Sequence, residues 1–126
     1  MMNDYSAYLL PGIAFVLTTA TGIWLSQLGK PLNGVLFTVH KLVAVAAVIA
    51  ATIPLYTALR SASAPTLAIM LLIAGGISVV VLFATGALIS LNHPAVALLQ
   101  WAHRIAPVLA LLTIGWAAYL IDRASF

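Results

Sequence analysis

The sequence predicts an all-α fold, an integral membrane up-down-up-down four-helix bundle built from a duplicated two-helix unit. Hydrophobic residues make up 64% of the 126 residues and charged residues only 6%, a balance typical of membrane proteins. Four apolar segments reach the length of about 20 residues that a helix needs to cross a bilayer. The second half of the chain also repeats the pattern of the first half.

The four apolar segments are expected to form helices over residues 8–28, 35–59, 66–90 and 95–121. Between them lie "GKPLNG", "RSASAP" and "LNHP", which contain the Pro, Gly, Asn and Ser residues typical of turns. Because these connections are short, consecutive helices should pack antiparallel. Residues 1–126 are therefore expected to form a single four-helix transmembrane domain.

The internal repeat relates residues of about 8–60 to residues of about 66–123. The segment "GIAFVLTTATGIWLS" aligns with "GISVVVLFATGALIS" at an offset of 64 residues, with Gly12 on Gly76. After a deletion of one residue in the loop, the offset becomes 63 residues, and the matched pairs are Pro31/Pro94, His40/His103, Lys41/Arg104, Tyr56/Tyr119 and Arg60/Arg123. Agreement of these residue types in a fixed order indicates a duplication. Because each unit crosses the membrane twice, both repeats should have the same orientation.

Two histidines occupy equivalent places within apolar helices. His40 lies in "LFTVHKLVAVAAVIA", about five residues inside the second predicted helix, and His103 lies in "LLQWAHRIAPVLALL", about eight residues inside the fourth. These positions are roughly 8 and 12 Å deep at 1.5 Å per residue. In a cyclic bundle the second and fourth helices are diagonal, so the two imidazoles should face each other across the centre. Since an unpaired imidazole in hydrocarbon is costly, the pair implies a shared partner.

A b-type haem fits this pair better than a small metal ion. A bare zinc or copper ion would find only two histidine ligands at this level, with no carboxylate or thiolate to complete its coordination. Haem iron takes two axial imidazoles, and its porphyrin edge is apolar. The sequence therefore predicts one bis-histidine haem b, with His40 and His103 as the metal ligands.

Other residues near the histidines are expected to surround this haem. Lys41 and Arg104 each follow a histidine, and helical side chains tilt toward the N-terminus of their helix. Both cations are therefore expected to extend toward the membrane surface and to bind propionates or lipid phosphates.

The "ATG" triplet of each repeat is expected to lie at the level of the histidines. Gly22 and Gly86 would form a small surface against the porphyrin edges, with Thr21 and Thr85 as hydrogen-bond donors. Trp101, two residues before His103, is placed to pack on the cofactor.

Composition excludes several kinds of site. Glutamate is absent and there are only two aspartates, so chemistry that needs paired carboxylates or a carboxylate metal cage lacks ligands. Cysteine is absent, which excludes thiolate-held clusters, disulfides and cysteine nucleophiles. The net charge of +3 comes from scattered cations and favours lipid headgroups or acidic ligand groups over nucleic acid.

Structural interpretations remain open beside the functional ones. The histidines can serve as hydrogen-bonding helix residues, and the small residues can serve helix packing alone; packing is the favoured role of Gly75 and Gly76. His93, in "NHP", is interpreted as a solvated loop residue, with a propionate contact or a quinone-site proton relay as the alternative.

The segments "TVHKLVAVAAV" and "LLQWAHRIAPVLALL" resemble the histidine-arginine helices of haem A synthase, a duplicated membrane protein whose four-helix halves hold a b-type haem between histidines. The resemblance covers essentially one such half and implies that His40 and His103 are axial ligands. That family places a glutamate near its catalytic histidines, and this chain has none, so its oxidation chemistry is not implied. The chain is also similar to other small bis-histidine membrane cytochromes, including the anchors of succinate dehydrogenase.

The resulting expectation is a multi-pass protein of a bacterial or archaeal cytoplasmic membrane that transfers single electrons between a quinol or redox partner and another subunit. An electron-transfer protein or subunit is favoured over a stand-alone enzyme. Its expected partners are the lipid bilayer, a quinone, and other redox or membrane subunits or further copies of itself, but no nucleic acid. The alternatives are a pigment-binding or structural subunit of a larger membrane complex, with a magnesium chlorin on each histidine, and a transporter that uses the histidines as a proton relay.

Overall fold

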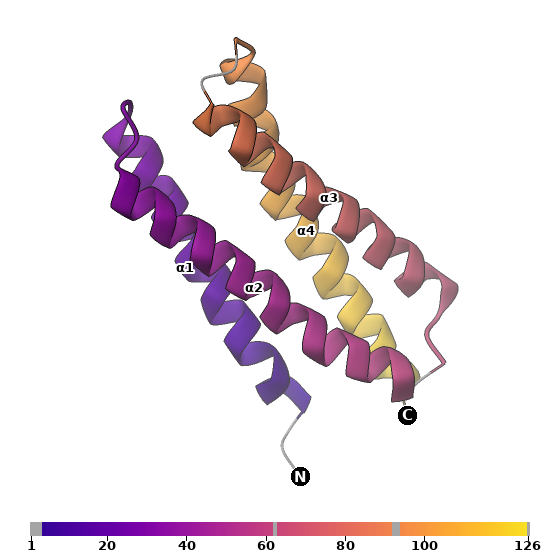
Figure 1. Ribbon diagram of the computed structural model, residues 1–126. Helices are drawn as coiled ribbons and strands as arrows, with labels where there is room; N and C mark the ends of the chain where they lie inside the picture. The colour runs from indigo at the N-terminus through magenta and orange to yellow at the C-terminus, as the bar shows by residue number, and fades with distance from the viewer. Residues whose placement is uncertain (1–3, 62, 92–93, 126) are drawn as a thin grey trace. The chain divides into compact units, whose positions relative to one another are not determined.

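The structure is a computed structural model that describes residues 4–61, 63–91 and 94–125. A short 3-10 helix, η1 (Asp4–Tyr8), leads into α1 (Leu9–Leu28), and α2 (Gly34–Ser61), α3 (Thr66–Ser90) and α4 (Val96–Ala124) follow (Figure 1). The described residues contain no strand, so the all-α prediction is confirmed. The predicted helix ends are correct to within three residues, with the largest difference at the end of α4 (residue 121 against 124).

In the described part of the chain, four helical segments are long and apolar enough to cross a membrane. They have mean hydropathies between 1.6 and 2.8, and they span Ser6–Leu28, Gly34–Ser61, Thr66–Ser90 and Val96–Ala124. Large aliphatic side chains remain exposed on every helix, among them Leu10 at 67%, Val35 at 77%, Val80 at 68% and Leu98 at 70%. Surfaces this apolar are suited to lipid, because an α-helix satisfies most of its backbone polar groups by internal hydrogen bonds. The chain is an integral membrane protein.

The connection before α2 explains where that helix begins. Gly29 has a φ of +70°, a backbone conformation that glycine adopts without strain. The side-chain oxygen of Asn33 accepts a hydrogen bond from the backbone N–H of Leu36 at 3.0 Å, and the carbonyl of Asn33 accepts one from the N–H of Phe37 at 2.9 Å. Asn33 is therefore the N-cap of α2.

The described residues form two compact units, divided between Thr57 and Ala58. The first unit contains η1, α1 and most of α2, and the second contains the last turn of α2 with α3 and α4. This division falls close to the boundary between the two sequence repeats. Each unit is a helix hairpin. The single four-helix domain and the diagonal placement of the histidines stay predictions.

The second unit has a small core of its own. Ala68 on α3 packs with Ala117 and Ile121 on α4, all with 0% exposure, and partly buried aliphatic residues surround them. Two turns after Ala68 on α3, a Cβ added to Gly75 would lie 2.5 Å from Cγ1 of Ile114. The packing role predicted for Gly75 is therefore confirmed. At the adjacent glycine, Gly76, an added Cβ would meet no atom within 4 Å, and its packing role stays a prediction.

Polar side chains within the helices are satisfied locally. Thr and Ser hydroxyls donate to carbonyls one turn earlier, as Thr38 does to Gly34 at 2.8 Å and Thr52 to Val48 at 2.8 Å. Among the described residues, no buried side-chain nitrogen or oxygen lacks a hydrogen-bond partner. These bonds let hydroxyl groups lie in an apolar helix at low cost.

Candidate functional site

His40 extends from α2 to the backbone of α1 within the first unit. Its Nδ1 lies 3.1 Å from the carbonyl oxygen of Thr18 and 3.1 Å from the hydroxyl oxygen of Thr21. The side chain is partly buried. This contact joins the two helices of the hairpin through one polar side chain.

The partners of Thr21 determine which atom donates. The Thr21 hydroxyl lies 2.8 Å from the carbonyl of Leu17 and 3.0 Å from that of Thr18, so its single hydrogen is directed to a backbone carbonyl. A carbonyl oxygen only accepts. Nδ1 of His40 is therefore the donor to both oxygens, and in the neutral ring the lone pair belongs to Nε2.

Gly22 makes room for this imidazole. A Cβ added to Gly22 would lie 2.9 Å from Cε1 of His40 and 3.4 Å from its Nδ1. Any side chain at this position would thus press on the ring. The sequence interpretation assigned this surface to a porphyrin edge, whereas the structure places the imidazole against it.

The second unit contains the same arrangement at the repeat-equivalent positions. Nδ1 of His103 lies 3.0 Å from the carbonyl oxygen of Leu82 and 3.0 Å from the hydroxyl oxygen of Thr85. The Thr85 hydroxyl donates to the carbonyl of Val81 at 2.7 Å or of Leu82 at 3.1 Å. A Cβ added to Gly86 would lie 3.0 Å from Cε1 of His103.

The two local sites also occupy similar positions along their helices. His40 lies six residues after Gly34, the first residue of α2, and His103 lies seven residues after Val96, the first residue of α4. These separations correspond to roughly 9 and 10.5 Å of helix. The similarity is closer than the roughly 8 and 12 Å expected from the predicted helix ends. One difference remains: Thr85 is buried, with 7% exposure, and Thr21 is only partly buried.

The cations next to the histidines are exposed. Nζ of Lys41 lies 4.6 Å from the ring centre of Phe37, one turn nearer the N-terminus of α2. The side chain thus extends toward the helix N-terminus, which is the direction expected for it. Arg104 is exposed on α4.

Trp101 lies two residues before His103 on α4, and its packing on a cofactor stays a prediction. Its side chain is 67% exposed, and residues two positions apart on a helix do not face each other. This placement favours an anchoring role at the membrane interface. His93 lies outside the described residues.

Aromatic and basic residues also gather near the end of α4. Cζ of Arg123 lies 5.3 Å from the ring centre of Tyr119, and the rings of Tyr119 and Trp116 are 5.7 Å apart. Tyr119 and Trp116 are exposed to 47% and 57%. Exposed aromatic rings beside a cation are typical of the membrane–water interface.

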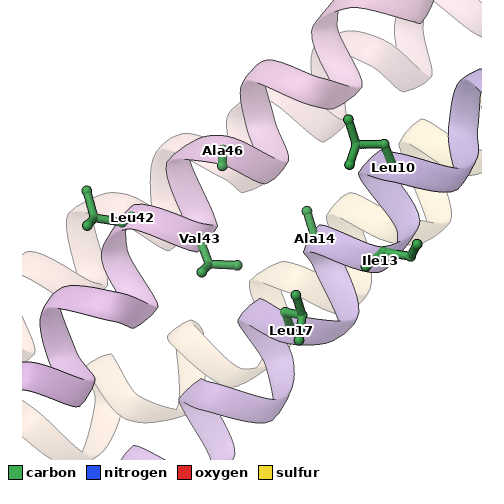
Figure 2. A pocket seen from close by; sticks show the side chains of 7 residues that line it. All are labelled: Leu10, Ile13, Ala14, Leu17, Leu42, Val43 and Ala46. Carbon is green, nitrogen blue, oxygen red and sulfur yellow. The ribbon is translucent and has the colours of Figure 1, made fainter.

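A shallow groove of about 390 Å³ lies between α1 and α2 of the first unit. Figure 2 shows its lining, which is aliphatic throughout and consists of Leu10, Ile13, Ala14, Leu17, Leu42, Val43 and Ala46. On α2 the lining of the groove begins at Leu42, two residues after His40. It offers no polar group, so its chemistry suits hydrocarbon.

Each histidine has the local setting that is typical of a metal-ligating imidazole. Among the described residues, no group of three or more His, Cys, Asp or Glu residues is placed to hold a metal. Metal-ligating histidines are typically held by a hydrogen bond from their other ring nitrogen to a carbonyl or a similar acceptor. Both His40 and His103 have this bond, and their residues therefore fit the haem that the sequence implies.

Sequence reasoning did not identify the carbonyls of Thr18 and Leu82. The repeat aligns these two positions, but their residue types differ. Because only the backbone oxygen takes part, side-chain identity carries no signal there. The spacing did contain one signal, since each position lies three residues before an aligned threonine.

Comparison with known proteins found no match: no family model, no curated protein and no solved structure is significantly similar to this chain.

Proposed function

We propose that the protein is a membrane b-type cytochrome that carries one haem on His40 and His103 and transfers single electrons. The observation that supports this most is the repeated setting of the two histidines. In each unit, Nδ1 donates to a backbone carbonyl, at 3.1 Å in one and 3.0 Å in the other. Both neutral rings therefore have the lone pair on Nε2, the nitrogen that would ligate iron.

The residues around the histidines have separate roles in this proposal. A bound haem would supply one-electron redox chemistry. His40 and His103 would hold the haem iron, each through its Nε2. Lys41 and Arg104 balance the charge of the propionates. Gly22 and Gly86 allow the imidazoles to lie against the neighbouring helix.

The partners follow from the membrane location. Lipid surrounds the exposed aliphatic side chains, and a quinol or another redox subunit supplies or accepts the electron. Assembly with other membrane subunits or with further copies of the chain is part of this proposal. A bacterial or archaeal cytoplasmic membrane is the proposed location.

The proposal is tested by the absorption spectrum of the purified, haem-loaded protein. We expect a Soret band and a sharp α band on reduction, because two imidazoles make a low-spin haem. His40→Ala and His103→Ala should each abolish the low-spin spectrum, and His93→Ala should keep it. Wild-type protein without these bands after loading with protohaem, or an unchanged spectrum in both alanine variants, would contradict the proposal.

A second candidate is a subunit that binds one macrocycle on each histidine. Its support is that each imidazole has a complete hydrogen-bonded setting within its own unit. The same preparation distinguishes the two candidates. One iron per chain supports the bis-histidine haem, whereas two macrocycles per chain, or chlorins in a pigment extract, support separate ligation.

A further inference from the structure

We infer that Thr21 and Thr85 are positioning residues that fix the tautomer and direction of the two histidine rings. Each hydroxyl accepts the Nδ1–H of a histidine and thereby keeps the lone pair on Nε2. The inference rests on the proposed function in one respect, namely that the atom bound by the Nε2 lone pair is haem iron. The hydrogen-bond geometry supports the tautomer by itself.

The first argument is that each threonine can only accept from its histidine. A hydroxyl group has one hydrogen, and in both threonines a carbonyl of the same helix lies within 2.8 Å to receive it. The remaining role of the oxygen toward the imidazole is acceptance. The alternative tautomer, with hydrogen on Nε2, would place the Nδ1 lone pair against the lone pairs of two oxygens.

The second argument is that the arrangement occurs twice. Threonine, glycine and histidine have the same relation in both units, with Nδ1 to Oγ1 distances of 3.1 and 3.0 Å. The glycine that follows each threonine lets the ring approach this closely, since an added Cβ would lie 2.9 or 3.0 Å from Cε1. The same ring nitrogen, Nδ1, faces the threonine hydroxyl in both hairpins.

The consequence for a bound haem is electronic. A histidine whose Nδ1–H is donated to two oxygens is a stronger electron donor through Nε2. Stronger donation stabilises ferric iron more than ferrous iron. The threonines would therefore lower the reduction potential of a bound haem, and loss of either hydroxyl would raise it.

The test uses the full chain in detergent, labelled with ¹⁵N-histidine and free of haem, at a pH of about 8, where an unperturbed histidine is neutral. Long-range ¹H–¹⁵N correlation spectra report which ring nitrogen carries the hydrogen. We expect the Nδ1–H tautomer for His40 and His103 in the wild-type protein. Thr21→Val should shift only His40 toward the other tautomer, and Thr85→Val should shift only His103.

Matched variants separate positioning from folding. Thr21→Ser and Thr85→Ser keep a hydroxyl and should restore the wild-type signals. Thr19→Val removes a hydroxyl that bonds only to the carbonyl of Phe15, at 3.0 Å, and should leave both histidines unchanged. In the haem-loaded protein, either Thr→Val variant of the site should raise the midpoint potential, and the serine variants should return it.

The failures of the two proposals are distinguishable. A wild-type protein with hydrogen on Nε2, or wild-type spectra in both Thr→Val variants, would overturn the role of the threonines, because the carbonyls alone would then suffice. If the protein takes up no haem, the proposed function fails while the tautomer measurement still decides this inference.

Discussion

At the scale of single residues, each imidazole of the candidate site is in contact with the backbone of a second helix. Gly22 and Gly86 permit this contact, and Thr21 and Thr85 complete it with a hydrogen bond. The sequence identified these four residues and the two histidines as one group, because they recur in both repeats. It assigned the glycines and threonines to a porphyrin, since the register between neighbouring helices is not visible in residue types.

Alanine substitutions test the glycines at this scale. Gly→Ala inside a helix stabilises it by about 0.5–1 kcal/mol, but at Gly22 or Gly86 the new Cβ would displace the ring and break its hydrogen bonds, which contribute about 0.5–1.5 kcal/mol each. We expect the free energy of unfolding of Gly22→Ala and Gly86→Ala to be unchanged or lower than that of the wild type. Denaturant titration in micelles measures it.

The repeat supplies matched controls for these variants. Gly12 and Gly76 lie on the same helices, and a Cβ added to either meets no atom within 4 Å. Gly12→Ala and Gly76→Ala should therefore keep or increase stability. Equal effects at all four glycines would show that the imidazole contacts contribute nothing.

At the scale of helices, the two hairpins differ in how closely they pack. Buried residues occur on both helices of the second unit, with Ala68, Gly75 and Thr85 on α3 and four residues on α4. In the first unit, α1 has one buried residue, Leu25, and α2 has none. The aliphatic groove between α1 and α2 is consistent with this looser packing (Figure 2).

Gly75 provides the test of packing between α3 and α4. A Cβ at this position would lie 2.5 Å from Cγ1 of Ile114 and 2.9 Å from Oγ1 of Thr113. Overpacking of this kind typically costs about 1–3 kcal/mol. We expect Gly75→Ala to lower the thermal midpoint followed by circular dichroism. The neighbouring variant Gly76→Ala, which adds a methyl group in open space, should not lower it, and a similar loss in both would contradict the close contact.

At the scale of the whole molecule, the described chain has four helices that can cross a membrane. An even number of crossings places the two ends of the described chain on one face, together with the connection between α2 and α3. The connection between α1 and α2 then lies on the opposite face.

Cysteine labelling tests this topology directly, because the chain has no cysteine of its own. In right-side-out vesicles, a membrane-impermeant maleimide should label Ser63→Cys and Ser125→Cys from one side and Asn33→Cys only from the other. Labelling of Asn33→Cys and Ser63→Cys from the same side would contradict four crossings.

The sequence by itself determined that this is an all-α membrane protein with four helices and a repeated histidine, because span length, apolar composition and repeated polar residues are properties of residue types. Only the tertiary structure decided what each histidine contacts. The carbonyls of Thr18 and Leu82 belong to the backbone, so residue types do not reveal their role. The direction of the Thr21 and Thr85 hydroxyls depends on helix geometry. In each unit, the carbonyl and the threonine hydroxyl both lie within hydrogen-bond distance of Nδ1, and together they assign the hydrogen to Nδ1 and the lone pair to Nε2.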